Sequence, residues 1–410
     1  MNVAVLVDLM LVKKAGGHVK YWQRISEALS EQKIDCHITV FFLGEKNQTQ
    51  KINKNVKFTT LRPILSSKIL RSFGIDADTT DLSPMNPRLF FLLKRFQIIH
   101  TTDQFFCMST TAKLASRFFK IPLTTSIHTD TPPYSKYYVE KIIKKFNFLK
   151  INNYLIQTLK LHKKIEQKML NKVYDFIRCT KAAMVADNIY SPQNLITKTG
   201  NKNITKLNRG IDNKIFNSKK NNKDIFAKYN IPYTDKIIFF SGRIHELKGA
   251  LLLAKIHKRL LKSGISVTTL MAGENIHGKL CKEIAPNKLN LIGYLSQQDL
   301  ADLYRSCDVF VFPSNFEIGP NVVIEAKACG AVCVVSPNGG GKRIYFPGKD
   351  GIIVKKWNLD LWVKTLRDLL KNENKIIKIK KFLESNSKIT SWKEVFIKEI
   401  FPHWKKVERK

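Results

Sequence analysis

The chain has 410 residues, of which 44% are hydrophobic and 10% aromatic, so it is long enough for about two or three domains and apolar enough to bury a large core. These proportions exclude a wholly disordered chain, a collagen-like chain and a small disulfide-stabilised scaffold. Its 70 Lys and Arg against 33 Asp and Glu give a formal net charge of +37, which favours polyanionic partners: nucleic acid, an anionic membrane surface or phosphorylated ligands.

The first half alternates apolar runs with amphipathic segments. A strand over Val3–Val7 leads into a loop containing Gly16 and Gly17, and an amphipathic helix begins at Val19. Strand, glycine loop and helix are the opening of a nucleotide-binding domain. Further elements are predicted at Ile38–Phe42, Ile98–His100, Leu123–Ile127 and Phe176–Cys179 (strands) and at Met108–Phe119 (helix). This alternation predicts a doubly wound parallel α/β sheet.

A polar segment at 201–235 precedes a second start of the same kind. The strand Ile237–Phe240 is followed by a glycine loop and by a helix over Ala250–Leu261. Further strands are predicted at Val267–Met271, Leu289–Ile292, Val309–Phe312 and Val332–Val335. We therefore predict two doubly wound domains that meet near residue 205, with a ligand in the cleft at the carboxyl ends of both sheets.

Seven scattered cysteines include one close pair, Cys329 and Cys333, with no second pair or histidine cluster to complete a zinc site. We expect reduced cysteines in a cytoplasmic protein and no metal site. The apolar start of the chain is interrupted by Asp8 and has no preceding basic residues, unlike a signal peptide. The sequence contains no run of about 18 apolar residues, so no membrane-spanning helix is predicted and membrane contact is expected to be peripheral.

Two motifs carry chemistry. The loop Gly242–Gly249 lies between a strand and a helix, so its N–H groups and the helix dipole suit a phosphate, to which Arg243 and Lys248 add two cations. Glu317 and Glu325 follow the strand Val309–Phe312 and lie eight residues apart, so two carboxylates can accept hydrogen bonds from the vicinal hydroxyls of a ribose and a hexose. The alternatives are a solvated basic loop and an unrelated acidic pair.

In combination, these features resemble glycosyltransferase family 4, the retaining, nucleotide-sugar-dependent enzymes of the GT-B fold. The resemblance covers nearly the whole chain and is carried by Gly16-Gly17, His128, Arg209–Asp212, Phe216, Gly242–Gly249, Ala272-Gly273-Glu274, Gly293, Glu317, Glu325, Ala326 and Gly330. It implies two Rossmann-like domains facing across a cleft. The N-terminal acceptor domain would span 1–205, with a helix at about 388–410 packing back onto it, and the C-terminal donor domain would span 206–387.

The resemblance also implies a role for each matching residue. Arg243 and Lys248 would hold the donor diphosphate and stabilise the departing nucleoside diphosphate without a metal or other cofactor. Glu325 would bind the nucleotide ribose, while His128 and Glu317 would contact the reacting sugar as catalytic residues. For His128, the alternative is a histidine that caps a strand at the edge of the core.

Backbone contacts complete the site that the resemblance implies. Ile318, Gly319, Pro320 and Asn321 would line the sugar hydroxyls with their backbone, and Gly16 and Gly17 would let the N-terminal backbone approach the donor phosphates. The glycine after Glu317 is shifted relative to the family pattern. Lys342 and Arg343 also stand where the family often has an acidic residue.

The segment Thr125–Tyr134 is similar to that of the branch of this family that glycosylates diacylglycerol and phosphatidylinositol. From Lys136 to Lys172 the chain has ten Lys and two Glu among apolar side chains, and Lys160, Lys163, Lys164 and Lys168 fall at helical spacing. A basic amphipathic helix suits an anionic lipid interface, at about 1 kcal/mol per lysine near the surface. The alternative is a solvated helix whose apolar side faces the core.

We therefore expect a retaining enzyme, peripheral on the inner face of the membrane, that moves a hexose from a UDP- or GDP-sugar to a lipid. The first alternative is transfer to lipopolysaccharide or another surface glycan precursor. A basic nucleic-acid-binding protein is a second alternative, which the even spread of basic residues disfavours. A catalytically inactive scaffold is a third.

Overall fold

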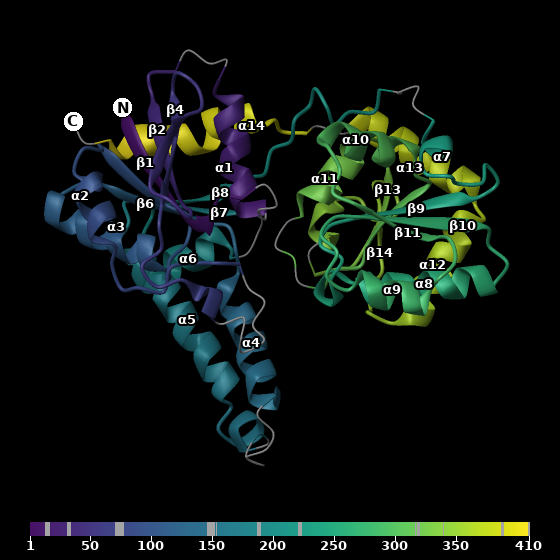
Figure 1. The fold of residues 1–410 in the computed structure, drawn as a ribbon. Coiled ribbons are helices and arrows are strands. Elements are labelled where there is room, and N and C mark those ends of the chain that lie inside the picture. The colour runs from purple at the N-terminus through teal and green to yellow at the C-terminus, as the bar shows by residue number, and fades with distance from the viewer. Residues whose placement is uncertain are drawn as a thin grey trace. The chain divides into compact units, whose positions relative to one another are not determined.

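The computed structural model describes residues 1–12, 17–30, 34–69, 78–145, 152, 154–186, 190–219, 224–315, 317, 320–338, 340–386 and 389–408. The chain forms two compact units (Figure 1). Unit 1 comprises 1–208 together with 392–410, and unit 2 comprises 209–391. These divisions lie close to the expected boundaries at 205/206 and 387/388.

Unit 1 contains an eight-stranded sheet. Its strands are β1 (Asn2–Met10), β2 (His37–Leu43), β3 (Gln48–Lys51), β4 (Val56–Leu61), β5 (Ile98–Thr101), β6 (Leu123–Ile127), β7 (Ala182–Ala186) and β8 (Ile204–Leu207). They lie in the order β3-β4-β2-β1-β5-β6-β7-β8, and every neighbouring pair is parallel except β3 with β4. The chain winds outward in both directions from β1, which confirms the predicted doubly wound topology.

Helices cover both faces of this sheet. They are α1 (Gly17–Ala28), α2 (Pro87–Leu93), α3 (Cys107–Phe119), α4 (Thr131–Lys145), a π-helical turn at Tyr154–Thr158, α5 (Leu161–Arg178) and α6 (Pro192–Thr199). Alternate residues of β1 enter two cores: Val3, Val5 and Val7 pack with α1, whereas Ala4 and Leu6 pack with α2 and α3. A strand buried on both faces explains why its sequence is almost uninterruptedly apolar.

The predicted strand at Phe176–Cys179 is wrong. Phe176 and Ile177 lie in the last turn of α5, buried together with Val173, and the strand of this region is β7. Spacings of three and four residues place these side chains on one face of a helix. The apolar run is too short for its length to distinguish a strand from a helix end.

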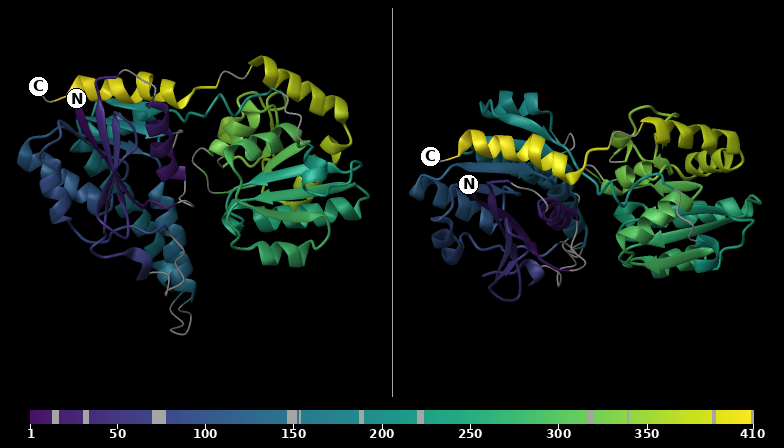
Figure 2. Two further views of the ribbon diagram at one scale, coloured as in Figure 1. Left: turned by 45° about the horizontal axis from the view of Figure 1, so that its top comes forward. Right: turned by 90° about the horizontal axis from the view of Figure 1, so that it is seen from above.

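The C-terminal segment returns to unit 1 through α14 (Trp392–Val395), a π-helical turn (Phe396–Ile400) and α15 (Phe401–Val407). Figure 2 shows this segment, in yellow, alongside the N-terminal part of the chain. Its side chains Trp392, Phe396 and Trp404 join the core of β1 and α1. The Trp404 ring stacks on that of Trp22, with centroids 6.2 Å apart.

Unit 2 contains a six-stranded, wholly parallel sheet in the order β11-β10-β9-β12-β13-β14. Its strands are β9 (Lys236–Ser241), β10 (Val267–Ala272), β11 (Leu289–Gly293), β12 (Val309–Phe312), β13 (Val332–Val335) and β14 (Ile352–Ile353). Its helices are α7 (Ile225–Lys228), α8 (Ala250–Lys262), α9 (Gly278–Ile284), α10 (Gln297–Ser306), α11 (Asn321–Ala328), α12 (Leu359–Leu370) and α13 (Glu373–Asn386), with 3₁₀ turns at Glu246–Lys248 and Gly341–Arg343. From β9 the chain first adds β10 and β11 on one side and then adds β12, β13 and β14 on the other. This order confirms the second doubly wound unit.

Candidate functional site

The loops after β9 and β12 bring together residues predicted from the sequence to bind the donor. These two strands flank the switch point of unit 2, where loops that diverge from neighbouring strands leave room for a ligand. Gly249 permits the loops to touch: its φ is +77°, and a Cβ there would lie 2.3 Å from the carbonyl oxygen of Pro313. Glycine at this position therefore sets the distance between the two halves of the site.

Lys248 and Glu317 form an ion pair between the two loops. Their side chains are only 18% and 17% exposed, respectively. The Ser314 hydroxyl donates to the carbonyl oxygen of Leu247 at 3.2 Å, a second link between the same loops. Two groups predicted to contact different parts of one ligand thus neutralise each other, and a bound phosphate would compete with Glu317 for Lys248.

Arg243 lies exposed at the start of the first loop. The loop is held against the end of β10, because Ile244 N–H donates to Glu274 O at 2.7 Å and a Cβ on Gly273 would lie 2.1 Å from Gly242 O. The pKa of Tyr294 is raised by burial and by the charge of Glu274, while Arg243 opposes this rise. Arg243 therefore belongs to the same edge of the sheet as these loops.

The backbone N–H groups of this loop are already engaged. Those of 246–250 all donate within the unit, two to the imidazoles of His245 and His277 and the others to backbone carbonyls. The expectation that N–H groups at this helix start would face a phosphate is therefore wrong for 246–250. Phosphate contacts there depend on the side chains of Arg243 and Lys248.

The start of α11 holds two further predicted residues. Glu325 is half-buried and lies near Tyr304, whose pKa is raised well above its usual value by burial and by the Glu325 charge. The amide oxygen of Asn321 is buried and accepts no hydrogen bond within the described residues. Because buried oxygens in proteins almost always have a donor, this oxygen is suited to accept a hydrogen bond from a ligand.

Three predicted site residues, Gly16, Ile318 and Gly319, lie outside the described residues. Gly17 is the exposed first residue of α1, and Pro320 is the buried residue that precedes α11. In the part of the chain that the structure describes, no three or more His, Cys, Asp or Glu side chains are grouped as a metal site would require.

His128 directly follows β6 in unit 1 and is 3% exposed. Its Nε2 lies 2.7 Å from Ser126 Oγ, and the rings of His18 and Tyr21 pack against it at centroid distances of 4.8 and 4.6 Å. A sugar could reach this imidazole only after the groups covering it had moved. The alternative interpretation of His128, as a histidine at the edge of the core, agrees with this burial.

His128 ends a chain of buried hydrogen bonds. His100 Nε2 lies 2.9 Å from Ser126 Oγ, and burial lowers the pKa of His100 to about 3, so His100 is neutral. The indole N–H of Trp404, which can only donate, lies 3.4 Å from His100 Nδ1. The Thr124 hydroxyl also lies 2.9 Å from His100 Nδ1 and is able to donate to it. With Nδ1 as the acceptor, the proton of His100 lies on Nε2 and is donated to Ser126, whose hydroxyl then donates to His128 Nε2.

His100 and Ser126 were not predicted from the sequence as members of a site. A signal for both was present, because each is a polar residue in a segment predicted to be a buried strand. Buried polar groups need partners, and two neighbouring parallel strands supply them to each other.

The basic region predicted as one amphipathic helix consists of α4 and α5, which run side by side away from the sheet (Figure 1). Lys163, Lys164 and Lys168 of α5 are exposed, whereas Lys160 precedes the helix. None of the helices described is both long and apolar enough to cross a bilayer.

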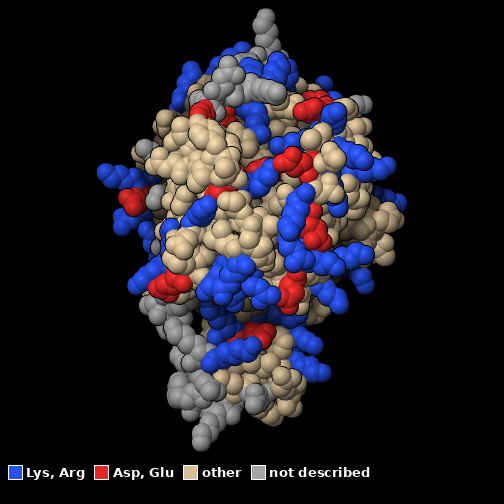
Figure 3. Space-filling view, turned by 90° about the vertical axis from the view of Figure 1, so that its right-hand side faces the viewer, with Lys and Arg blue, Asp and Glu red and all other residues tan. Residues whose placement is uncertain are grey.

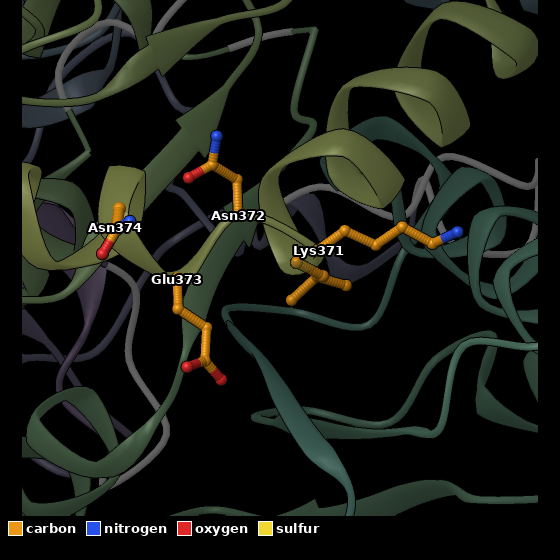
Figure 4. Close-up of a pocket in the computed structure, with 5 residues that line it drawn as sticks. Lys371, Asn372, Glu373 and Asn374 are labelled. Atoms are coloured by element: carbon orange, nitrogen blue, oxygen red, sulfur yellow. The ribbon is translucent and has the colours of Figure 1, made fainter.

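A depression outside these loops is lined by Leu370, Lys371, Asn372, Glu373 and Asn374, between α12 and α13 (Figure 4). Its labelled side chains point in different directions. Glu373 pairs at 2.6 Å with Lys236, the first residue of β9, so the depression lies at the amino edge of the sheet. It is therefore separate from the loops that carry Lys248 and Glu317.

The comparisons with known proteins concern mainly unit 2. Residues 221–386 match the family model described as Glycosyl transferases group 1. A GDP-mannose-dependent alpha-mannosyltransferase of Corynebacterium glutamicum is 30% identical over 133 residues, covering 32% of this chain and 30% of that protein. A D-inositol 3-phosphate glycosyltransferase of Corynebacterium urealyticum is 25% identical over 174 residues, covering 40% and 41%. Such matches span 27–42% of the curated relatives' own length.

Solved structures resemble nearly the whole chain. Anabaena HepE, in complex with UDP and glucose, has a TM-score of 0.66 at 13% identity and covers 96% of this chain and 97% of its own. Sucrose-phosphate synthase from Thermosynechococcus elongatus has a TM-score of 0.70 at 15% identity, covering 99% and 98%. These likenesses confirm the predicted GT-B fold.

Proposed function

We propose that this chain, whose residues 221–386 match the family model of the group 1 glycosyl transferases, moves a sugar from a nucleoside diphosphate sugar to an acceptor hydroxyl. The observation that carries the proposal is the Lys248–Glu317 ion pair at the switch point of the matched unit. Arg243, Asn321 and Glu325 lie on the same loops or on the helix that follows them. This set offers cations for phosphates and oxygens for hydroxyls.

Donor binding exchanges partners within the ion pair. When the diphosphate takes Lys248 as a counter-ion, Glu317 loses its cation and gains the capacity to accept a hydrogen bond from a sugar hydroxyl. Lys248 and Arg243 then face the oxygens on which negative charge grows as the bond to the sugar breaks. Because that charge is largest when the bond is nearly broken, both cations favour the transition state over the bound donor.

The donor in this proposal is a UDP- or GDP-hexose, and transfer retains the anomeric configuration. HepE binds UDP and glucose, and the Corynebacterium glutamicum relative is named for GDP-mannose, which supports testing both bases. Retention comes from the resemblance to family 4, and no covalent nucleophile is assigned.

The acceptor in this proposal is a membrane lipid, with the protein peripheral on the inner face of the membrane. The segment Thr125–Tyr134 resembles the lipid-glycosylating branch, and α5 exposes Lys163, Lys164 and Lys168. Figure 3 shows Lys and Arg spread over one face of the molecule with acidic side chains between them. A dispersed charge of this kind supports attraction to an anionic surface more than it supports a groove for nucleic acid.

The test incubates the protein with labelled UDP- and GDP-hexoses and anionic vesicles that contain diacylglycerol, in excess chelator, and then separates lipid from water. We expect label in the lipid phase, lost in Lys248→Ala and kept in Lys258→Ala, an exposed lysine on α8. Lipid labelling by Lys248→Ala at the wild-type rate would contradict the proposed site. Label transferred only to a water-soluble, delipidated glycan acceptor would favour the surface-glycan alternative.

A further inference from the structure

Helices α2 and α3 expose apolar side chains on the face of unit 1 that is turned away from the sheet. Phe91 of α2 is 71% exposed, and Phe118 and Leu114 of α3 are 73% and 45% exposed. The opposite sides of both helices are buried in the core, through Leu89 and Leu93 of α2 and through Met108, Ala112 and Ala115 of α3. Leu114 and Phe118 are four residues apart, so they lie on one side of α3.

The exposed phenylalanines belong to a cluster of four rings. The centroid of Phe90 lies 5.4 Å from Phe91, 5.7 Å from Phe118 and 5.0 Å from Phe119, and Phe118 lies 5.1 Å from Phe119. The cluster joins two helices that lie side by side (Figure 1). Isolated exposed apolar side chains are ordinary, but a contiguous exposed patch marks an interaction surface.

Basic residues flank this cluster in the sequence. Residues 82–122 contain six Lys and Arg and a single acidic residue, Asp103. The cations are Arg88, Lys94, Arg95, Lys113, Arg117 and Lys120, of which all but the half-buried Lys113 are exposed. Within the residues that the structure describes, none of the six takes part in an ion pair. Arg117 Nη2 donates to Cys179 Sγ at 3.6 Å, but no carboxylate neutralises any of the six, so their charge can attract an external anion.

We propose that the α2–α3 face, defined as Phe91, Leu114 and Phe118 with these six cations, docks on the anionic surface of a lipid bilayer. The apolar side chains enter the interface while the cations meet the headgroup phosphates. This inference depends on the proposed function only for the biological reason to approach a membrane, since docking itself requires no catalysis.

A bilayer fits this face better than nucleic acid does. Nucleic-acid surfaces that stack bases rely on aromatic rings, whereas this face also exposes the aliphatic side chain of Leu114, on which no base can stack but which a bilayer interface accepts. The surface of α4 and α5, which was predicted from the sequence to contact lipid, also carries unpaired lysines, but some of its cations are neutralised, unlike those of α2 and α3. Its Lys136 and Lys144 pair with Glu166 and Glu140.

The test measures co-sedimentation of the full chain with vesicles of zwitterionic lipid containing about one third anionic lipid. Phe91→Ser combined with Phe118→Ser removes the rings and keeps every charge. We expect this double variant to lower the partition coefficient at least about tenfold, because two aromatic side chains that would enter the lipid interface are lost. The Arg88→Gln, Arg117→Gln double variant should lower the partition coefficient about fivefold for each charge that is removed.

Two controls make the outcome decisive. Phe346→Ser changes a 57% exposed phenylalanine of unit 2 and should leave binding unchanged. Lys164→Gln with Lys168→Gln removes charge from α5 and should have a smaller effect than the α2–α3 variants. The inference is overturned if the double phenylalanine variant binds vesicles as the wild type does. It is also overturned if this variant loses binding to duplex RNA while its binding to vesicles is unchanged. Sedimentation needs no sugar donor, so it separates this inference from a failure of the proposed transferase activity.

Discussion

In the proposed donor site, Lys248 and Glu317 would make the strength of donor binding depend on competition between a carboxylate and the donor phosphates for one lysine. An isolated cation would offer its full charge to a phosphate, whereas here that charge is shared with a carboxylate held on the neighbouring loop. Breaking such a pair costs energy, which binding must first supply. Affinity for the nucleotide and the rate of transfer should therefore respond differently to changes at Glu317.

Replacing Glu317 by Gln should strengthen binding of UDP or GDP while slowing transfer. Lys248 no longer has to leave a carboxylate, so we expect nucleotide affinity to rise about fivefold, the equivalent of about 1 kcal/mol for a partly exposed pair. Transfer should fall at least about tenfold, because the sugar loses a charged acceptor for its hydroxyl. Calorimetry with UDP and GDP and initial-rate measurements give the two values. Glu246→Gln is the control in the same loop, and weaker nucleotide binding by Glu317→Gln would contradict the exchange of partners.

The hydrogen-bond chain from Trp404 to His128 predicts the tautomer of His128. With Ser126 donating to Nε2, we expect the imidazole proton of His128 on Nδ1. In protein labelled with ¹⁵N-histidine, the imidazole shifts should show this tautomer. Ser126→Ala should shift the population toward the Nε2–H form and lower transfer about tenfold, while Ser126→Thr, which keeps the hydroxyl, should restore both. An Nε2–H tautomer in the wild type would reverse the direction assigned to the whole chain of hydrogen bonds.

Residue spacing was sufficient to select the members of the candidate site but not to predict their pairing. Arg243, Lys248, Glu317 and Glu325 stand out because they fall in loops after apolar strands. That Lys248 meets Glu317 depends on the close approach of the two loops at Gly249. The network behind His128 depends similarly on strand register, which pairs His100 with Thr124 across β5 and β6.

At the scale of elements, Asp235 precedes β9 and links the start of that strand to the starts of β10 and β11 through hydrogen bonds. Its fully buried carboxylate accepts hydrogen bonds from Ser266 (2.6 Å), Thr268 (2.7 Å) and Lys288 (2.9 Å), which precede or begin β10 and β11. Burial alone would raise the pKa of Asp235, but these hydrogen bonds outweigh it and lower that pKa below 3.8. The folded state therefore favours the ionised carboxylate.

Replacing Asp235 by Asn should lower the free energy of unfolding by about 1–3 kcal/mol at neutral pH. Because the folded-state pKa is below the unfolded value, the stabilisation is present above about pH 4 and is lost as the pH falls through the folded pKa. The difference between wild type and variant in urea unfolding should accordingly shrink from about pH 7 to about pH 3. Asp360→Asn, in an exposed pair with Arg259, should cost less than about 1 kcal/mol. A constant difference at all pH values would contradict the assignment to Asp235.

Elements with clear periodicity were predictable, and short polar or ambiguous ones were not. The central strands of both sheets, β1, β2 and β5 in unit 1 and β9, β10 and β12 in unit 2, correspond to apolar runs in the sequence. The edge strand β3 consists of Gln48–Lys51, every residue of which is exposed, so no burial pattern marks it. The basic region was predicted as one helix because periodicity does not reveal where a chain reverses to form α4 and α5.

At the scale of the whole molecule, the charge of +37 acts on every polyanion, so attraction alone does not identify the partner. Salt screens this general attraction within about 8 Å at physiological ionic strength. The apolar contribution of Phe91 and Phe118 is not screened. Binding to a bilayer and binding to nucleic acid should therefore separate as salt is raised.

We expect duplex DNA to bind in low salt and to be released as salt rises from about 50 to about 200 mM, with a loss of about a thousandfold in affinity, because phosphate contacts supply nearly all of its binding. The affinity for anionic vesicles should fall less than the affinity for DNA over the same range of salt. The vesicle binding that remains at high salt should disappear in the Phe91→Ser, Phe118→Ser double variant. Parallel titrations of both partners measure this difference. DNA binding that is tight at the upper salt concentration would instead favour the nucleic-acid alternative. Equal salt sensitivity of DNA and vesicles would assign membrane attraction to net charge alone, with no contribution from the exposed rings.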